Sequence, residues 1–282
     1  MLRSQVSKSA WTLSVGGLPF VSHTPGAPFA VALRREKTYE SDRGTVKEHV
    51  VEAERIPLTD VAETAEGVIL SGGGHALRVE VVPCDGGAEL LFTGEGGWAY
   101  AFALAALDGE AVFGGGEQYR QTNLRGEQVV NFVSEHIKAA TILEKALLPR
   151  FLYKEKSHSA IGSYAPMPVF VTDSGRMFLF STGADGFAEF GEEAYRFSFD
   201  ACPESLTLWQ ADSYAELSAL LTKKLPNRQY LPDWCREGMI LGVQGGTETV
   251  LKKAFAMLDA GAAVSGVWSQ DWSGFNRTIA GY

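Results

Sequence analysis

Two apolar runs near the C-terminal end of the sequence, residues 238–243 and 264–268, are each followed directly by side chains that can bind a sugar. These following residues are Gln244 after the first run, and Gln270, Asp271 and Trp272 after the second. Together, amide and carboxylate groups can donate hydrogen bonds to sugar hydroxyls and accept them, and an indole can cover the apolar C–H side of a sugar ring. The pattern favours carbohydrate binding over the alternative, in which glutamine and aspartate cap the next helix and the tryptophan packs under a loop.

The segments around these residues predict how they are positioned. Residues 238–243 form a compact apolar run, as expected of a strand buried on both faces, and residues 264–268 form a second apolar strand. Residues 247–260 between them have helical spacing and end at Gly261. This order predicts a βαβ unit and a parallel sheet, whose strands bind ligands at their carboxyl ends. One such unit is not stable alone, so it either docks on the rest of the chain or, as we favour, is a truncated piece.

A glycine-rich motif, FGGGEQY over residues 113–119, is the second candidate for chemistry. Three consecutive glycines permit tight backbone geometry, and Glu117 and Gln118 follow them. A phosphate-binding loop is disfavoured because no Lys–Ser or Lys–Thr pair follows and no βα unit surrounds the motif. We therefore expect a loop that projects Glu117 and Gln118 toward a neighbouring domain, with Arg125 close by and able to pair with a carboxylate.

The first two hundred residues contain many short apolar runs separated by turn signals, which favours an antiparallel sandwich. The predicted strands span residues 11–15, 29–33, 67–70, 76–82, 88–92, 98–104, 168–172, 177–181, 194–200 and 205–210. Residues 127–156 break this rhythm and are expected to form a long loop, either functional or a solvated insertion. Ser213 and Glu216 form a capping box that begins a helix. We expect a β-sandwich domain over residues 1–225 and the start of a second domain over residues 226–282.

The composition disfavours several classes of function. The 282 residues carry a formal net charge of −9 without a cluster of lysines and arginines, which speaks against binding of nucleic acid or of an anionic membrane. The three cysteines are far apart and odd in number, so neither a disulfide framework nor a zinc site is expected, and the histidines show no metal-ligand spacing. No signal peptide or membrane-spanning apolar stretch is visible, so we expect a cytoplasmic protein without a cofactor.

The motifs GGGEQY with a trailing LRG, LPDW, LGVQGGTE and GVWSQDWSG follow one another in this order. Together they resemble glycoside hydrolase family 31 and are most similar to the sulfoquinovosidases of that family. The resemblance covers residues 110–282, whereas the first hundred residues share only general strand character. It implies an all-β N-terminal sandwich of the galactose-mutarotase type, followed by the first βαβ unit of a truncated (β/α)8 TIM barrel.

The resemblance also implies a substrate. Sulfoquinovosidases are retaining enzymes that release sulfoquinovose, a glucose with a sulfonate at C6, from its α-glycosides. In ordinary α-glucosidases of the family, the second barrel strand ends with an acidic residue, whereas Gln270 stands in that region of this sequence. An amide can donate to a sulfonate, while a carboxylate would repel it. The resemblance implies that Gln244 ends the first barrel strand and that Glu117 and Gln118 lie at the pocket rim. The expected partner is therefore a carbohydrate, a sulfonated α-glycoside.

The resemblance implies that the catalytic residues lie outside this sequence. Retaining hydrolysis needs two carboxylates about 5–5.5 Å apart, and the aspartate nucleophile and aspartate acid/base of the family are expected beyond Tyr282. Asp271 does not match the nucleophile motif, so the chain alone is expected to be inactive. Two alternatives stay open: an ordinary α-glucosidase or α-xylosidase of the same family, and a non-catalytic β-sandwich that binds carbohydrate. The oligomeric state, a homo-oligomer included, also stays open.

Overall fold

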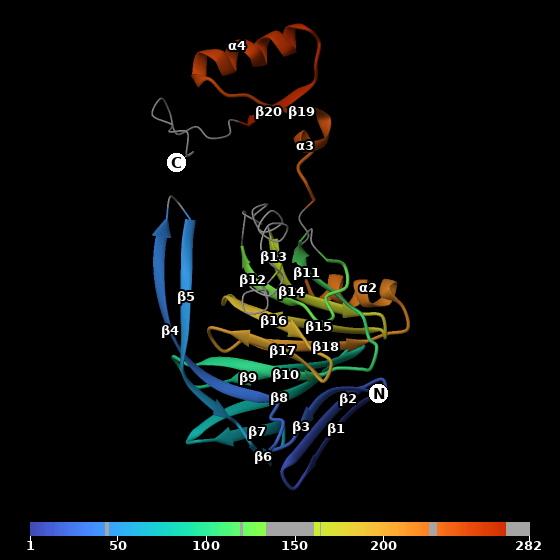
Figure 1. Cartoon of the computed structure of the whole chain (residues 1–282). Helices are drawn as coiled ribbons and strands as arrows, with labels where there is room; N and C mark the ends of the chain where they lie inside the picture. The colour runs from blue at the N-terminus through green and yellow to red at the C-terminus, as the bar shows by residue number, and fades with distance from the viewer. Residues whose placement is uncertain (43–44, 119–120, 134–160, 164, 226–229, 269–282) are drawn as a thin grey trace, which may run out of the picture. The chain divides into compact units, whose positions relative to one another are not determined.

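The chain forms two compact units. The structure, a computed structural model, describes residues 1–42, 45–118, 121–133, 161–163, 165–225 and 230–268 (Figure 1). The first unit comprises residues 1–36 and 50–224, and the second comprises residues 37–49 and 225–282. None of the helices in the described part of the chain has the length and apolar character needed to span a bilayer.

Three sheets build the β-rich part of the chain. A small sheet has the order β1 (Leu2–Ser7), β2 (Ala10–Val15) and β3 (Leu18–His23). A seven-stranded sheet has the order β13 (Ile161–Ser163), β12 (Gln128–Val133), β16 (Gly186–Phe190), β17 (Ala194–Phe199), β10 (Ala99–Ala105), β4 (Ala30–Asp42) and β5 (Thr45–Pro57). An eight-stranded sheet has the order β11 (Val112–Glu117), β14 (Ala165–Thr172), β15 (Arg176–Ser181), β18 (Ser205–Gln210), β9 (Gly87–Thr93), β8 (His75–Cys84), β7 (Gly67–Gly72) and β6 (Asp60–Glu63). Most neighbouring strands are antiparallel, whereas β12 and β13 are parallel.

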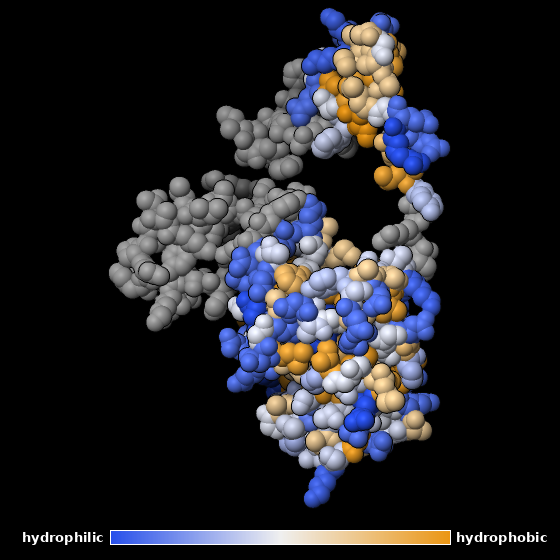
Figure 2. All heavy atoms as spheres, turned by 90° about the vertical axis from the view of Figure 1, so that its right-hand side faces the viewer, coloured by the Kyte–Doolittle hydropathy of each residue, from blue (hydrophilic) through white to orange (hydrophobic). Residues whose placement is uncertain are grey.

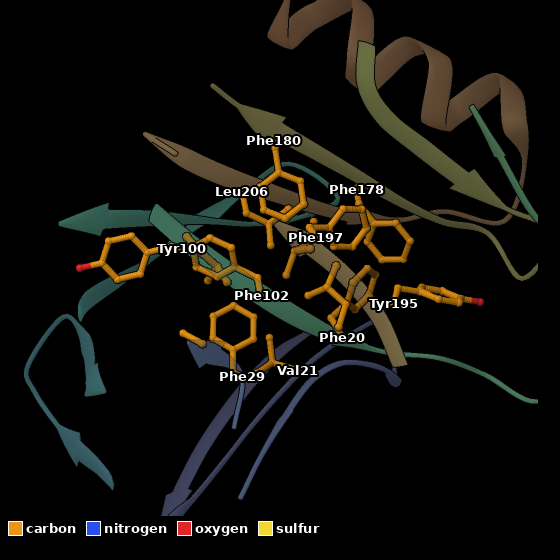
Figure 3. Packing of buried hydrophobic residues seen from close by; sticks show 14 of the residues in the cluster. Phe20, Val21, Phe29, Tyr100, Phe102, Phe178, Phe180, Tyr195, Phe197 and Leu206 are labelled. Carbon is orange, nitrogen blue, oxygen red and sulfur yellow. The ribbon is translucent and has the colours of Figure 1, made fainter. Parts of the chain in front are cut away.

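The aromatic core lies between the two large sheets (Figure 3). Phe197 in β17 faces Phe180 in β15, with ring centroids 4.8 Å apart, and Phe102 in β10 lies 6.0 Å from Phe180. Each of these three side chains is 1% exposed. Burying one such side chain contributes about 1.5–3 kcal/mol, and the alternation of side chains along each strand directs them to the same face. The prediction of an all-β N-terminal sandwich is therefore confirmed.

Helix α2 (Tyr214–Lys224) covers part of the outer face of the eight-stranded sheet. Leu217 is 0% exposed and belongs to the same apolar cluster as Trp209 of β18. The Ser213 hydroxyl accepts a hydrogen bond from the Glu216 backbone N–H at 3.3 Å. This contact satisfies one of the N–H groups that the start of a helix leaves unpaired, and it confirms the predicted helix start.

The prediction of a long loop over residues 127–156 is wrong at its beginning. Residues 128–133 form β12, which pairs antiparallel with β16. Val129 is 2% exposed and belongs to the core. The β-branched residues of this segment are of the type that packs well in a strand. The rest of the segment lies outside the described residues.

The second unit contains the predicted βαβ unit. Its elements are α3 (Trp234–Glu237), β19 (Met239–Gly242), α4 (Gly246–Asp259) and β20 (Val264–Trp268). β19 and β20 pair in parallel, and α4 connects them. The prediction that the first of these strands is buried on both faces is wrong, because Met239 is 47% exposed and Ile240 is 52% exposed. One neighbouring strand and one long helix do not cover both faces of a strand.

Apolar side chains also lie on the surface of the second unit (Figure 2). The large apolar residues of its βαβ segment that are at least 36% exposed are Met239, Ile240, Leu251, Phe255, Met257, Leu258, Val267 and Trp268. An amphipathic helix draws most of its stability from packing its apolar face on other elements. The unit therefore has more apolar surface than its own described elements cover.

His23 is buried in the first unit as a neutral imidazole. It is 0% exposed, its Nδ1 accepts from the Phe29 backbone N–H at 3.2 Å, and its Nε2 lies 3.3 Å from the Thr59 carbonyl oxygen. A ring with its proton on Nε2 satisfies both contacts, whereas a second proton on Nδ1 would face the Phe29 N–H. Burial lowers the pKa of His23, although the Thr59 carbonyl and the Asp60 charge act in the opposite direction.

We expect the free energy of unfolding to fall as the pH drops below the ordinary histidine pKa of 6.5. Below that pH the unfolded chain binds a proton that the folded chain excludes, so this group contributes a slope of about 1.4 kcal/mol per pH unit down to its lowered folded pKa. The His23→Asn variant, whose side-chain oxygen can still accept from the Phe29 N–H, should lack this contribution. Urea unfolding between about pH 5 and 8 gives the slope of the free energy of unfolding against pH for the unmodified chain and for the variant. Equal slopes would contradict the assignment of His23 as a buried neutral imidazole.

Candidate functional site

The glycine-rich arm, residues 112–118, consists of β11 and Gln118. The φ angles of Gly114, Gly115 and Gly116 are +121°, +81° and +94°. Residues with a side chain rarely adopt φ angles in this left-handed region, whereas glycine adopts them without strain. The register with β14 also shifts within this stretch, as in a β-bulge. The expectation of a loop is therefore wrong for residues 113–117, since they belong to β11 at one edge of the eight-stranded sheet.

Backbone atoms of β14 explain why side chains are excluded from the arm. A Cβ atom on Gly116 would lie 2.0 Å from the Ala165 carbonyl oxygen, and one on Gly114 would lie 2.3 Å from the Val169 carbonyl oxygen. Both distances are far shorter than a normal contact between non-bonded heavy atoms, about 3.5–4.0 Å. Main-chain atoms of two adjacent strands therefore determine the course of the arm.

The arm ends in the two polar residues that the sequence predicts for the site. Glu117 is exposed and Gln118 is partly buried. The Ser163 hydroxyl donates to the Glu117 carbonyl oxygen at 2.9 Å. The Gln118 side chain accepts from the Gln121 backbone N–H at 3.1 Å and donates to the Gln121 carbonyl oxygen. Glu117 is thus an exposed residue at the end of the arm, and the hydrogen-bonding chemistry of its carboxylate is that of an acceptor.

A buried polar cluster that the sequence analysis missed lies at the base of the arm. Glu110, two residues before β11, is 3% exposed, and its carboxylate accepts two hydrogen bonds from Arg176, which is 0% exposed. The Tyr195 hydroxyl donates to Glu110 Oε2 at 2.6 Å, and the Ser174 hydroxyl donates to Oε1. Glu110 follows an Asp-Gly turn signal and therefore resembles an exposed turn residue in the sequence. No local signal reveals its burial.

The environment of Glu110 keeps its carboxylate ionised. Burial acts to raise its pKa, but hydrogen bonds from Arg176, Ser174 and Tyr195 together with the Arg176 charge outweigh burial and lower the pKa from 4.5 to about 2. Burial and the hydrogen bond to Glu110 raise the pKa of Tyr195. At neutral pH, Glu110 is therefore an acceptor and Tyr195 a donor, and Glu110 is unsuited to deliver a proton as a general acid.

Arg125 contacts a hydroxyl and backbone carbonyls instead of pairing directly with a carboxylate. Its Nη1 donates to Tyr195 Oη at 2.9 Å and to the carbonyl oxygens of Leu107 and Glu110 at 3.0 and 3.3 Å. Its Nη2 donates to the Glu192 carbonyl oxygen at 3.2 Å. A guanidinium has five N–H donors, and these carbonyls satisfy several of them. Arg125 therefore reaches the Glu110 carboxylate through Tyr195.

Gln244 lies in the second unit and is exposed. The Val243 N–H donates to the Trp268 carbonyl oxygen at 3.0 Å, so the parallel pairing continues up to the residue before Gln244. Gln244 is therefore at the carboxyl end of its strand, where parallel α/β folds bind ligands. The other residues predicted from this region, Gln270, Asp271 and Trp272, lie outside the described residues. Among the described residues, no group of three or more His, Cys, Asp or Glu side chains could hold a metal ion.

Two curated proteins with similar sequences are both named sulfoquinovosidase. The chain is 31% identical over 190 residues to a sulfoquinovosidase of Escherichia coli (strain K12), a match that covers 63% of this chain and 26% of that protein. It is 26% identical over 293 residues to a sulfoquinovosidase of Agrobacterium fabrum (strain C58), which covers 98% of this chain and 42% of that protein. The chain thus spans less than half the length of each of these relatives.

A solved structure has a similar fold. A family 31 sulfoquinovosidase from E. rectale, in complex with the aza-sugar inhibitor IFGSQ, has a TM-score of 0.73 and 24% identity, covering 98% of this chain and 42% of that chain. The chain is therefore similar in sequence to two sulfoquinovosidases and in fold to a sulfoquinovosidase of glycoside hydrolase family 31. The predicted resemblance is therefore confirmed, and the relatives are glycosidases by name, in agreement with the prediction of a glycosidase. No family model matches the chain.

The predicted site residues divide between the two units. Glu117 and Gln118 are neighbours at the end of the arm in the first unit, and Gln244 follows β19 in the second unit. A shared pocket that these residues line together with Gln270 stays a prediction. The buried cluster around Glu110 is the part of the arm's environment that the sequence analysis did not find.

Proposed function

We propose that the chain forms the sandwich and the beginning of the catalytic barrel of a retaining α-glycoside hydrolase that releases sulfoquinovose from its α-glycosides. The observation that carries this proposal is the match to the Agrobacterium fabrum sulfoquinovosidase over 98% of the chain. The proposed partner is accordingly a small carbohydrate, an α-glycoside with a sulfonate group.

The proposed architecture is a sandwich domain over residues 1–225 and the first part of a (β/α)8 barrel over residues 226–282. Its support is the parallel β19–α4–β20 unit, since barrels of this kind are built by repeating a strand and a helix. The exposed apolar residues of that unit also support it, because further strands and helices of a barrel would cover them.

The proposed sugar pocket is lined by the residues at the carboxyl ends of the first two barrel strands. Gln244 follows the first strand, and Gln270 with its neighbours Asp271 and Trp272 follows the second. The amide of Gln270 would donate to the sulfonate, and the indole of Trp272 would cover the apolar side of the ring. Glu117 and Gln118 would contribute from the rim of the same pocket.

The proposed chemistry proceeds through a covalent glycosyl-aspartate intermediate and needs two carboxylates about 5–5.5 Å apart. We propose that residues 1–282 contribute substrate binding and supply neither of these two aspartates. The most deeply buried carboxylate of the described sandwich supports this division, because Glu110 is committed to Arg176 and stays ionised with a pKa of about 2.

A chimera tests the proposal. Residues 1–282 replace the matching segment of the Agrobacterium fabrum enzyme, and hydrolysis of nitrophenyl α-sulfoquinovoside is compared with that of the α-glucoside. We expect the chimera to prefer the sulfonated substrate and residues 1–282 alone to release no nitrophenol above a heat-killed control. In the chimera, Gln270→Glu should lower kcat/KM for the sulfonated substrate about fivefold or more, because two like charges at 4 Å repel by about 1–4 kcal/mol.

The matched control is Gln5→Glu, which adds the same charge on the exposed side of β1 and should change neither kcat/KM. Preference of the chimera for the α-glucoside would instead favour an ordinary α-glucosidase. Release of nitrophenol by residues 1–282 alone would overturn the proposed placement of the catalytic aspartates.

A further inference from the structure

One buried hydroxyl connects a residue before the glycine-rich arm with a residue after it, both at the base of the arm. Glu110 precedes the arm, Arg125 follows it, and the Tyr195 hydroxyl bonds to both, at 2.6 Å and 2.9 Å. Tyr195 belongs to β17 of the seven-stranded sheet, whereas the arm belongs to the eight-stranded sheet. The hydroxyl therefore links the arm to the opposite layer of the sandwich.

The chain returns beside its own starting point after the arm. The Asn123 side-chain oxygen accepts from the backbone N–H groups of Val112 and Arg125, at 3.1 Å and 3.0 Å. The Leu124 N–H donates to the Val112 carbonyl oxygen at 2.8 Å. Arg125 is therefore close in space to the first residue of the arm, and a constraint on Arg125 also acts on the base of the arm.

The Tyr195 ring holds its hydroxyl in a fixed position. The side chain is 0% exposed, and its ring lies 5.4 Å from the Phe190 ring and 6.1 Å from the Phe178 ring. The guanidinium carbons of Arg125 and Arg176 lie 5.6 Å and 5.8 Å from the ring centroid, within the range of a cation–π interaction. In Figure 3 the hydroxyl points away from the aromatic cluster, and it donates to Glu110 Oε2.

We infer that Tyr195 is a positioning residue that acts through Arg125 and Glu110 to hold the glycine-rich arm, and with it Glu117 and Gln118, in the geometry that binds the sugar. This inference rests on the proposed function for the sugar, while the anchoring of the arm is a property of the sandwich itself. Gly114, Gly115 and Gly116 have no side chains that could pack the middle of the arm in place, so the constraint on this stretch comes from the base of the arm, where Val112 is buried, and from the pairing with β14.

Amide hydrogen exchange of the 282-residue chain tests the anchoring. In Tyr195→Phe, which removes one oxygen atom, peptides covering residues 112–118 should exchange about tenfold faster, because the buried groups at the base of the arm lose a hydrogen-bond partner. Peptides of β8 and β9 should keep their exchange rates. A residue that only stabilises the fold would accelerate exchange throughout the sandwich.

Tyr100→Phe is the matched control. Tyr100 is also 0% exposed, and its hydroxyl accepts from the Glu95 backbone N–H at 2.9 Å, at the opposite end of the aromatic cluster (Figure 3). This variant should leave exchange of the arm unchanged. A second variant, Arg125→Lys, keeps the charge but loses the multiple hydrogen bonds, and it should accelerate exchange of the arm as Tyr195→Phe does.

The chimera tests the connection to the sugar. Tyr195→Phe should raise KM for the sulfoquinovoside several-fold more than it lowers kcat, and Tyr100→Phe should change neither. The inference would be overturned if Tyr195→Phe left amide exchange of residues 112–118 unchanged, or if it accelerated this exchange without raising KM. A chimera that hydrolyses only the α-glucoside contradicts the proposed function instead, and the exchange data then still decide the anchoring.

Discussion

Replacement of Glu110 by glutamine is expected to lower the free energy of unfolding by about 3–5 kcal/mol, the usual cost of removing one partner of a buried ion pair. The side chain of Arg176 is 0% exposed and that of Glu110 is 1% exposed, so water cannot solvate the charge that remains. The same pairing should make the chain acid-sensitive. Because the folded pKa of Glu110 is about 2 and its ordinary value is 4.5, its contribution is complete above pH 4.5 and is lost as the pH falls toward 2.

Urea unfolding of a double-mutant cycle measures this effect. Arg176→Met alone should also be strongly destabilising, whereas the combination with Glu110→Gln should cost clearly less than the sum of the two single changes. Asp85→Asn is the control, because Asp85 and Lys223 form an ion pair whose side chains are 71% and 73% exposed. Exposed pairs contribute about 0–1 kcal/mol. Strictly additive effects of the Glu110 and Arg176 variants would contradict the buried pair.

The Gly116→Ala variant should lose about 3 kcal/mol or more of stability, since two penalties act on the same atom. At a φ of +94° any Cβ carries a cost of about 1–2 kcal/mol, and this Cβ would also lie 2.0 Å from the Ala165 carbonyl oxygen. That oxygen is a backbone atom of β14, so relief of the contact must separate the two strands. The exchange rate of residues 112–118 should therefore rise as well.

Gly126→Ala separates the two penalties. Gly126 has a φ of +79°, but a Cβ there would meet no atom within 4 Å. Only the backbone penalty of about 1–2 kcal/mol should appear. Thermal or urea unfolding of both variants gives the difference, which is the energy of the close approach between β11 and β14. Equal losses of stability in Gly116→Ala and Gly126→Ala would show that the close approach between β11 and β14 carries no energy.

The strand pattern could be predicted where local sequence decides it. Residues 205–210 were expected as a strand and form β18 with the same bounds, because alternate apolar residues and flanking turn signals act locally. The segment 264–268 agrees with β20 for the same reason. Burial of β19 could not be predicted, because it depends on which elements cover Met239 and Ile240 and not on their own apolar character.

The candidate site was predictable only in its exposed part. The glycine motif located Glu117 and Gln118, because consecutive glycines and polar residues form a local signal. The cluster at the base of the arm joins Glu110 to Arg176 and Tyr195, which lie 66 and 85 residues further along the chain. Contacts between such distant residues follow from the packing of two sheets, and a single sequence has no periodicity that marks them.

The glycine-rich arm also has a consequence for redesign of the protein. Its path depends on main-chain contacts between β11 and β14, and the side chains of residues 117 and 118 extend beyond the last close approach, at Gly116. New chemical groups can therefore be introduced at residue 117 without a change in the backbone path, whereas Gln118 bonds the Gln121 backbone and should be kept. A small library of residue 117 variants, built on an unaltered Gly114–Gly116 stretch, would vary the chemical group that the tip of the arm presents.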